Sequence, residues 1–517
     1  MPNELDSIGP ICLIIPPSVF LLDERVFMTL GVLRVAACLE EAGYTVEMLD
    51  LSGIENYLAA VEAQALATSA RTFGFTATTP QMPAALQIAQ RLRALRPDAR
   101  LILGGPHVTL VNAAVKRERA RQFSGRAQAA FDRLQSAYDV LVAGDGEAAV
   151  FQALPRHAPK LVDGDDPSSP LFLNNQKLNA LPFPARHLVD ASSYHYTIDG
   201  VPALSLIAQL GCPFECGFCG GRESPMLRRV RMRTAQNVID EMLTMHFDHK
   251  INGFMLYDDE LNVNPGMVEL MNAIADAQSH LGVQWHLRGF VKAQLFTDAQ
   301  AEAMVRAGFR WILTGFESGD PRILRNINKR STRDENTRCV EIARRHGLKV
   351  KALMSIGHPG ETEESVRETH RWLLEAQPDD FDVSIITTYP GTPYYDRATP
   401  HPERSGVWVY SYPATGDRLY SYEVDYTEVA DYYKGKPGGG YKSYVFTDGL
   451  TADQLVTLRD FVERDVRQKC RIPFNPAKPP QRFEHTMGQF GLPEHILRVS
   501  TANRSFREPA EVRSYAP

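Results

Sequence analysis

The chain of 517 residues lacks long apolar runs, an excess of basic side chains and a dense set of cysteines. No stretch is long enough to cross a bilayer, so we expect no membrane span. The formal net charge of −6 gives no reason to expect nonspecific nucleic-acid binding. The N-terminus has no basic region followed by an apolar core and a cleavage site. Seven cysteines, four of them scattered, do not form a disulfide framework, which predicts a reducing, cytoplasmic location.

Three of the seven cysteines stand together in the segment "CPFECGFC", directly after the apolar run at residues 203–208. Cys212, Cys216 and Cys219 have the spacing C-x-x-x-C-x-x-C, which lets thiolates on one loop converge on a small inorganic core. Four cysteines would complete an ordinary electron-carrying iron–sulfur cluster, whereas three leave one iron open to a substrate or cofactor. A zinc site is one alternative, but it would normally need a fourth Cys or His at comparable spacing. A chance triplet of buried thiols is the other.

This triplet resembles the radical S-adenosylmethionine (SAM) superfamily, whose [4Fe-4S] cluster binds SAM at the open iron and splits it to a 5'-deoxyadenosyl radical. The aromatic Phe218 and the pair Gly220 and Gly221 also suit that family, because the backbone there must pass close to the methionine end of SAM. The usual acidic residue after the glycines is missing, and Arg222 stands in its place. The resemblance implies a [4Fe-4S] cluster on the three cysteines, SAM, and an external one-electron donor such as flavodoxin or ferredoxin.

Residues 1 to about 150 alternate short apolar runs with helical patterns, which predicts an α/β fold with a doubly wound, Rossmann-like parallel sheet. The expected strands are "ICLII", "YTVEMLD", "FGFTA", "RLILGG" and "YDVLVAG". Ligands of such sheets bind outside the carboxyl ends of the strands, here near residues 16–20, 76–81 and 104–108. No G-x-G-x-x-G follows any of these strands, which disfavours a nicotinamide or flavin dinucleotide.

The same residues resemble the cobalamin-binding domain that some radical SAM enzymes carry. The matching segments are "IIPPSV" after the first strand, "GGPHVT" after the fourth and "AGDGEAA" after the fifth. The resemblance implies cobalamin contacts from Pro17, Thr76, Thr78, Gly104, Gly105, His107, Gly144, Gly146 and Glu147. The alternative is a flavodoxin-like sheet without a cofactor.

The D-x-H-x-x-G motif of the methionine-synthase type is absent, and residues 16–31 contain no histidine. We therefore expect the lower cobalt face to be open, or held by water or another side chain. His107 could replace the missing ligand, but we expect it to hydrogen-bond backbone or the nucleotide tail of the cofactor.

From residue 201 onward, six strand candidates alternate with helical patterns, at 203–209, 252–257, 283–288, 309–316, 348–356 and 380–387. Six such units predict a partial (β/α)6 barrel of the TIM type, with function at the carboxyl ends of its strands. Polar side chains at these ends resemble radical SAM segments that contact the ribose, carboxylate and adenine of SAM. The resemblance implies SAM contacts from Asp258, Arg288, Glu317 and Ser318. Asp258 and Asp259 could instead act on substrate or cap the next helix, and Arg288 could be a solvated surface residue.

Beyond about residue 391 the resemblance becomes thin, and tyrosines gather between residues 410 and 444, near a glycine loop at 438–440. They could line a substrate pocket or form a mixed β region that packs on the barrel. The later "LTADQLVTLRDFVERDV" predicts an amphipathic helix with a capping box at Thr451 and Gln454, expected to close the open side of the barrel. We thus expect a cobalamin-binding domain (1–155), a linker (156–200), a radical SAM barrel (201–392) and a smaller α+β domain covering the barrel and substrate site (393–517).

The resemblance implies a cobalamin-dependent radical SAM methyltransferase that methylates an unactivated carbon. One SAM would methylate cob(I)alamin, a second would yield the 5'-deoxyadenosyl radical, and the substrate radical would take the methyl group from methylcobalamin. A cyclase, a mutase and a polar methylase of the same family are alternatives, and a noncatalytic cobalamin or redox sensor is an alternative of another class. The substrate is expected to be a small molecule or a peptide, and no side chain can be named as catalytic from the sequence.

Overall fold

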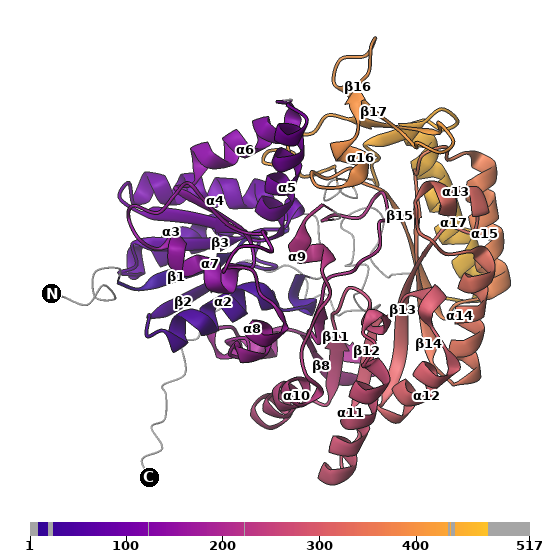
Figure 1. Cartoon of the computed structure of the whole chain (residues 1–517), viewed down its shortest axis with the longest axis horizontal. Helices are drawn as coiled ribbons and strands as arrows, with labels where there is room; N and C mark the ends of the chain where they lie inside the picture. Colours follow the sequence, from indigo (N-terminus) through magenta and orange to yellow (C-terminus); the bar gives the residue numbers. More distant parts are fainter. Residues whose placement is uncertain are drawn as a thin grey trace.

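The computed structural model describes residues 9–18, 24–122, 124–221, 223–432, 435 and 440–473. Two α/β units lie side by side, and a small antiparallel sheet stands at the edge of the second unit (Figure 1). No described helix is long and apolar enough to cross a membrane.

The first unit is a sheet of six parallel strands in the order β2-β1-β3-β4-β5-β6. Its strands are β1 (Ile11–Ile15), β2 (Val46–Asp50), β3 (Thr72–Thr76), β4 (Arg100–Gly104), β5 (Val140–Gly144) and β6 (Leu161–Gly164). Its helices are α2 (Leu30–Glu41), α3 (Tyr57–Ala67), α4 (Met82–Leu95), α5 (Pro106–Ala120), α6 (Arg126–Ala137) and α7 (Gly146–Ala153).

Helices cover both faces of this sheet, which explains why its strands read as continuous apolar runs. In β1, Cys12 and Ile14 belong to the core shared with α3, α4, α5 and α6. Ile11, Leu13 and Ile15 face the other way, into the core shared with α2 and α7. The predicted doubly wound sheet is confirmed.

The segment expected to be a linker contains ordered elements, so its interpretation as linker throughout is wrong. Residues Leu161–Gly164 form β6, which pairs in parallel with β5 and extends the sheet. A short helix, α8 (Asn175–Ala180), and a short strand, β7 (Thr197–Ile198), follow. A four-residue strand has too few alternations to stand out among the neighbouring Pro, Asp and Ser residues. The domain boundaries stay a prediction.

The second unit is the predicted partial barrel of six parallel strands, β8-β11-β12-β13-β14-β15, with β7 antiparallel on its first edge. Its strands are β8 (Val201–Leu206), β11 (Gly253–Leu256), β12 (His286–Phe290), β13 (Phe309–Glu317), β14 (Lys349–Ile356) and β15 (Asp380–Ile385). Its outer helices are α10 (Ala235–His249), α11 (Met267–Leu281), α12 (Asp298–Arg306), α14 (Arg333–Arg345) and α15 (Glu363–Ala376).

Short elements stand between the longer strands and helices. They are β9 (Gln209–Leu210), β10 (Arg231–Met232), α9 (Pro225–Arg228), α13 (Pro321–Asn326), α16 (Pro393–Asp396) and the 3-10 turns Glu24–Val26, Thr79–Gln81, Arg186–Leu188, Ala191–Ser193, Leu261–Val263 and Ala293–Leu295.

The last described helix, α17 (Ala452–Cys470), covers the outer edge strand β15, as predicted. Its capping box at Thr451 and Gln454 is present. Its side chains bond to the edge of β15: the backbone N–H of Val383 donates to Glu463 (2.6 Å), and Nε of Arg459 donates to the Val383 carbonyl (2.9 Å). The backbone N–H and carbonyl of Val383, on the edge of the open barrel, thereby have hydrogen-bond partners without a further strand.

The remaining C-terminal sheet is antiparallel and consists of β16 (Thr399–Pro400), β17 (Val407–Ser411), β18 (Arg418–Tyr422) and β19 (Val445–Thr447). Tyr410 of this sheet packs on Tyr394, with ring centroids 4.8 Å apart, and Tyr426 and Tyr432 join the core of the first unit. These contacts indicate that the three tyrosines pack the C-terminal region against the rest of the protein and do not line a substrate pocket. Tyr433 and the loop residues 438–439 lie outside the described residues, as does residue 222.

Candidate functional site

The carboxyl ends of the two parallel sheets face each other across the loop that carries the cysteines. A Cβ atom placed on Gly220 would lie 3.7 Å from Cδ1 of Leu110, in the first turns of α5. Beside this contact, Arg231 forms a buried ion pair with Asp145, which follows β5, at 2.6 Å. The crevice of the first unit and the mouth of the barrel therefore form one continuous region.

The cysteine loop is held from both sides by backbone hydrogen bonds. The N–H of Gly217 donates to the carbonyl of Ile327 (2.7 Å), and the Gly217 carbonyl accepts from the N–H of Tyr394 (3.1 Å). A Cβ on Gly217 would lie 2.3 Å from Cε1 of Tyr394, so only glycine fits there. Cys216 is 7% exposed, whereas Cys212 and Cys219 are half-buried.

Among the described residues, no three His, Cys, Asp or Glu side chains lie close enough together to hold one metal ion. A structural zinc site would normally have four protein ligands, one more than the three cysteines of the loop supply. In an iron–sulfur cluster each cysteine binds a different iron, so the thiolates do not need to approach one another so closely. The donor set therefore fits a cluster of several irons.

Two buried lysines lie beneath this loop, and sequence reasoning did not identify them. Nζ of Lys292 lies 4.0 Å from the centre of the Phe214 ring and donates to the carbonyl of Lys329 (3.4 Å). Burial, and next the charge of Lys329, lower the pKa of Lys292. Burial acts in the same direction on Lys329, but the pKa of Lys329 is raised because Glu317, Cys216 and Glu260 favour its charged form. The lysines place positive charge where three thiolates and a cluster would be negative. No sequence pattern marks an isolated loop lysine as buried.

Glu317, predicted from the sequence, is the centre of a hydrogen-bonded chain. Its Oε1 lies 3.1 Å from Nζ of Lys329, and its Oε2 accepts a hydrogen bond from Oγ of Ser355 (2.7 Å). Oγ of Ser355 lies 2.8 Å from Nε2 of His358. Glu317 has a φ of +65° at an irregularity between β13 and β14, a strained conformation that packing must maintain.

His358 is an unanticipated member of this chain. Because Ser355 gives its hydroxyl hydrogen to Glu317, Nε2 of His358 must be the donor to Ser355, which leaves Nδ1 as a bare acceptor. Nδ1 has no partner in the part of the chain that the structure describes. Burial lowers the pKa of His358 to about 3, so the ring is neutral. The ring packs edge-on against Phe218 of the cysteine loop, with centroids 5.4 Å apart.

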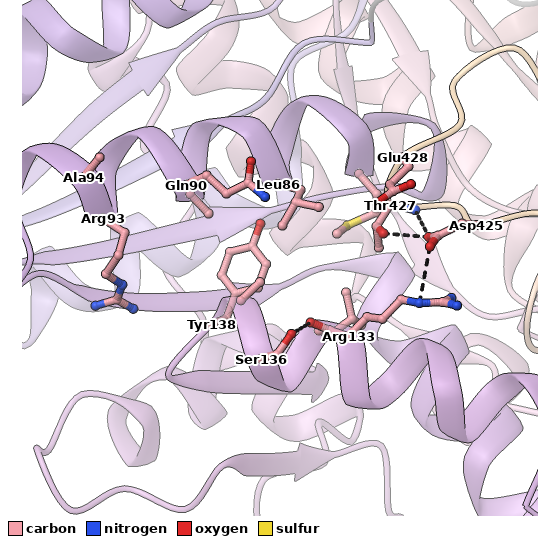
Figure 2. A pocket seen from close by; sticks show the side chains of 14 residues that line it. Leu86, Gln90, Arg93, Ala94, Arg133, Ser136, Tyr138, Asp425, Thr427 and Glu428 are labelled. Carbon is pink, nitrogen blue, oxygen red and sulfur yellow. Dashed lines mark hydrogen bonds and ion pairs between the residues drawn. The ribbon is translucent and has the colours of Figure 1, made fainter.

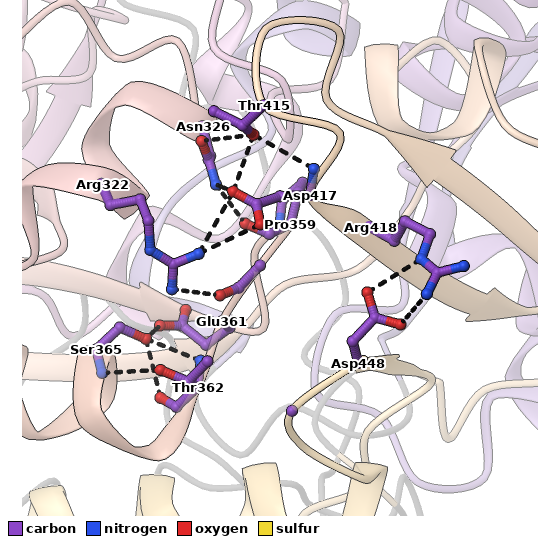
Figure 3. Close-up of polar contacts among 12 residues, drawn as sticks. Arg322, Asn326, Pro359, Glu361, Thr362, Ser365, Thr415, Asp417, Arg418 and Asp448 are labelled. Carbon is purple, nitrogen blue, oxygen red and sulfur yellow. Dashed lines mark hydrogen bonds and ion pairs between the residues drawn. The ribbon is translucent and has the colours of Figure 1, made fainter.

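Polar contacts of Pro359 and Glu361 fix the turn that directly follows His358 (Figure 3). Glu361, 1% exposed, accepts from Ser365 and from the backbone N–H groups of Gly357 (3.2 Å) and His358 (3.4 Å). Arg322 of α13 donates to the Gly360 carbonyl at 2.7 Å. Gly357 and Gly360 have φ values of +88° and +78°, as the predicted turn requires.

Asp258 and Asp259 hold the start of the cysteine loop. Asp258 accepts from the N–H of Gln209, and Asp259 accepts from the N–H of Gly211 at 3.0 Å. Burial raises the pKa of Asp258 to about 7, and its Oδ2 has no partner among the described residues. Neither residue caps the following helix, because the N-cap of α11 is Gly266.

Arg288 does not end its strand as predicted. β12 continues to Phe290, and Arg288 faces the barrel interior, where Nη1 donates to Oη of Tyr196 (3.1 Å) and the guanidinium lies 5.5 Å from the centre of the Trp311 ring. It is 7% exposed, so the alternative of a solvated surface arginine is wrong. The two residues by which the strand extends past Arg288 are Gly289 and Phe290, and a glycine within an apolar run does not mark the strand end reliably.

Ser318, by contrast, is engaged by neighbours outside the barrel mouth. Its Oγ accepts from the N–H of Asp320 (3.1 Å) and lies 3.1 Å from Oγ1 of Thr369 in α15. Gly221 has a φ of +81°, and a Cβ there would lie 2.2 Å from Cδ1 of Leu227. Gly221 is therefore required by its positive φ and by its packing against α9, whereas a Cβ on Gly220 would make only an ordinary contact with Leu110.

In the first unit, the strand ends bring together glycine backbone rather than large side chains. Gly105 has a φ of +95°, and a Cβ there would lie 2.7 Å from both the Ala77 nitrogen and Oγ1 of Thr76. A Cβ on Gly144 would lie 2.3 Å from the nitrogen of Asp165. Only glycine fits at these positions, which keeps the ends of β4 and β5 free of side chains.

The other predicted residues of this crevice have local partners. Oε1 of Gln81 accepts from the N–H of Thr78 (2.9 Å), and its Nε2 donates to the carbonyl of Pro16 (2.7 Å), which fixes the loop that contains Pro17. Burial, and next the charge of Asp145, raise the pKa of Glu147 in α7, whose first residue is Gly146. Gly104 ends β4.

His107 is 1% exposed, and its Nδ1 lies 3.0 Å from Oγ1 of Thr79. Burial lowers its pKa to about 3. The expectation that its ring bonds backbone or a cofactor tail is therefore not met on the Nδ1 side, where a threonine hydroxyl is the partner.

A separate groove of about 680 Å³ lies between α4, α6 and residues 425–428 (Figure 2). It is on the helical side of the first unit, away from the strand ends. It does not coincide with any predicted site.

Comparison with known proteins decides the class of both units. Residues 206–373 match the Radical SAM superfamily, and residues 24–135 match the B12 binding domain. The chain is a radical SAM protein with a B12-binding domain. The two regions coincide with the partial barrel and with most of the doubly wound unit.

Several known proteins resemble this radical SAM protein over more than half of its length. An uncharacterised methyltransferase of Pyrococcus horikoshii is 28% identical over 63% of the chain and 68% of its own length. The anaerobic magnesium-protoporphyrin IX monomethyl ester cyclase of Cereibacter sphaeroides is 25% identical over 70% of the chain, which spans only 59% of that relative. The structure of the radical SAM methyltransferase TsrM from Kitasatospora setae, with cobalamin and a [4Fe-4S] cluster bound, has the same fold, with a TM-score of 0.60, 17% identity and coverage of 92% of this chain and 93% of that one.

The cofactors of this radical SAM protein are accordingly a [4Fe-4S] cluster, SAM and cobalamin. The described residues fit all three. The cysteine loop has three thiols, and the buried cation of Lys292 lies against Phe214 of the same loop. The barrel mouth offers unpartnered polar atoms at Asp258 and His358, and the crevice offers side-chain-free glycine backbone.

Proposed function

We propose that this protein is a cobalamin-dependent radical SAM methyltransferase that methylates an unactivated carbon of a small molecule or peptide. The observation that carries the proposal is the junction of the two units, where Gly220 of the cysteine loop abuts Leu110 of α5. A reaction that needs both cofactors at one substrate requires such a junction. When bound, the cluster with SAM supplies hydrogen abstraction, and cobalamin supplies the methyl group.

In this proposal the side chains bind and orient the cofactors and do not themselves react with the substrate. Cys212, Cys216 and Cys219 bind the cluster, and Lys292 and Lys329 offset its charge. Glu317 and Asp258 contact SAM together with Gly220, Gly221 and Arg288, and Ser318 joins them only through its backbone, because its hydroxyl is held by Thr369 and Asp320. The crevice residues Pro17, Thr76, Thr78, Gly104, Gly105, His107, Gly144, Gly146 and Glu147 surround cobalamin.

We divide the chain accordingly into a cobalamin-binding domain (1–155), a connection (156–200), the radical SAM barrel (201–392) and a C-terminal domain (393–517). The last of these would cover the substrate. An external one-electron donor would reduce the cluster.

Ring formation is the second candidate, because the cyclase of Cereibacter sphaeroides is 25% identical over 70% of the chain. The barrel residues do not separate the two outcomes, since both begin with hydrogen abstraction from carbon. A noncatalytic sensor would not require the polar groups that converge at the barrel mouth.

The experiment that tests the proposal is comparison of the metabolites of cells with and without the gene. We expect a compound to disappear on deletion and a lighter relative, smaller by one CH₂, to accumulate. Growth with methionine labelled on its methyl group should place the label in the compound that disappears. A missing compound that differs by a ring closure, without label, would favour the cyclase.

A further inference from the structure

A basic surface surrounds the outer side of the cysteine loop, although the chain as a whole carries a formal charge of −6. Four arginines lie there, three of them exposed and Arg228 half-buried, and Arg228 and Arg330 share the carboxylate of Glu215. We call them the loop arginines: Arg228, Arg229, Arg330 and Arg397. The side chains of Arg330 and Arg397 are 62% and 47% exposed, so their charges act on the solvent side.

The fold assembles these charges from three separate segments. Glu215 lies between Cys212 and Cys216, Arg228 ends α9 and bonds to Oε1 of Glu215, and Nη2 of Arg330 lies 3.4 Å from Oε2. Glu215 is thus the shared ion-pair partner of two of the arginines.

Arg397 comes from the segment after α16 and is linked to the same region through Glu223. Its Nη2 lies 3.7 Å from Oε1 of Glu223, which also binds Arg117 and is only 10% exposed. The surface is therefore a product of tertiary structure rather than a run of charges along the chain.

A shallow hollow of about 630 Å³ lies within this surface, lined by Pro213, Glu223, Pro225, Arg228, Arg229 and Val230. Pro213 is exposed and directly follows Cys212, which is half-buried. A protein seated here would be one residue away from a cluster ligand. Electron transfer slows steeply with distance, so this face suits the delivery of electrons.

We propose that the loop arginines and this hollow form the docking surface for an acidic one-electron carrier protein. The proposal rests on the proposed function only in requiring a cluster on the three cysteines. One electron leaves the reduced centre of the carrier and enters the cluster, and no proton or atom is transferred. Opposite charges accelerate encounter and give the weak, salt-sensitive complexes that redox partners form.

The test measures cluster reduction in the full-length, reconstituted protein without SAM or substrate, by stopped-flow absorbance. The reductant is a purified acidic flavodoxin in its hydroquinone form, and dithionite is used in parallel because a small reductant needs no docking surface. The variant is R228E/R330E. The matched control is R306E/R367E, two arginines of similar exposure that each pair with one glutamate on helices far from the loop.

We expect the second-order rate with flavodoxin to fall by about tenfold or more in R228E/R330E at low ionic strength, and to change by less than about twofold with dithionite or in the control. The wild-type rate should fall as salt is added, and the milder R228Q/R330Q should be intermediate. An unchanged flavodoxin rate would overturn the proposal. So would an equal loss with both reductants, which would mean that the arginines maintain the cluster loop or serve another anion. Because no methyl transfer is measured, failure of the proposed reaction would leave these rates unaffected.

Discussion

Nζ of Lys329 lies 3.1 Å from Oε1 of Glu317, and both side chains are almost fully shielded from solvent beneath the cysteine loop. The other carboxylate oxygen accepts from Ser355, so each oxygen of Glu317 has a partner. The pair thus links the end of β13 to the loop after α13 and, through Ser355, to β14. It places a fixed cation next to Cys216, whose charge also favours protonated Lys329.

Replacing Lys329 with methionine should therefore be costly, because it leaves a buried carboxylate without its cation. We expect the free energy of unfolding to fall by about 3–5 kcal/mol. Urea unfolding under anaerobic conditions measures this. Arg306→Met, which removes the exposed partner of Glu302, should cost less than about 1 kcal/mol. Equal losses in the two variants would show that the buried pair does not stabilise the fold.

The three cysteines of the loop should hold all of the cluster iron. In C212A/C216A/C219A, iron and sulfide content after anaerobic reconstitution should fall to background while circular dichroism of the folded protein persists, because the doubly wound unit has its own core. Cys339→Ala and Cys470→Ala provide the controls. Iron that survives the triple change, or is lost in either control, would contradict the assignment.

Gly217→Ala should disrupt the loop, because the added methyl would lie 2.3 Å from Cε1 of Tyr394. We expect cluster content to fall at least severalfold. Tyr394→Leu in the same chain should restore part of it by removing the obstructing ring, and Gly31→Ala, where nothing lies within 4 Å, should have no effect. If Gly217→Ala reconstitutes like wild type, the tight contact with Tyr394 is not a constraint on the loop.

The sequence predicted the architecture because both units repeat short apolar strands and amphipathic helices, a pattern that periodicity detects. It also identified Glu317, since polar groups at strand ends of a barrel gather at its mouth. It could not identify Lys292, Lys329 or His358, because burial of an isolated polar residue depends on contacts between distant segments. Arg288 was misplaced for a related reason: the end of a strand is set by pairing with its neighbours, here through Phe290. Strand β6 has only four residues, too few for the alternation of apolar and polar side chains that would distinguish a strand from a linker.

Glu361 should make stability depend on pH in a defined direction. Burial raises its pKa to about 7 in the folded protein, against about 4.3 in the unfolded chain. The folded state therefore binds the proton more tightly, and the contribution of Glu361 to stability is lost as pH rises from about 4 through about 7. Relative to wild type, Glu361→Gln should gain roughly 3 kcal/mol between pH 4 and pH 8. Urea unfolding at several pH values measures the difference, with Glu364→Gln, an exposed site in the first turn of the following helix α15, as control. A pH-independent difference would contradict the buried environment.

The central claim, that both cofactor units act on one substrate, is tested most directly by counting the products of SAM. In an anaerobic reaction with the identified substrate, a reductant, and SAM labelled on its methyl group, we expect S-adenosylhomocysteine and 5'-deoxyadenosine in about equal amounts, with the label in the product. Each compound reports a separate use of SAM, one for the methyl group and one for hydrogen abstraction. 5'-Deoxyadenosine without S-adenosylhomocysteine, or S-adenosylhomocysteine without 5'-deoxyadenosine, would contradict the account.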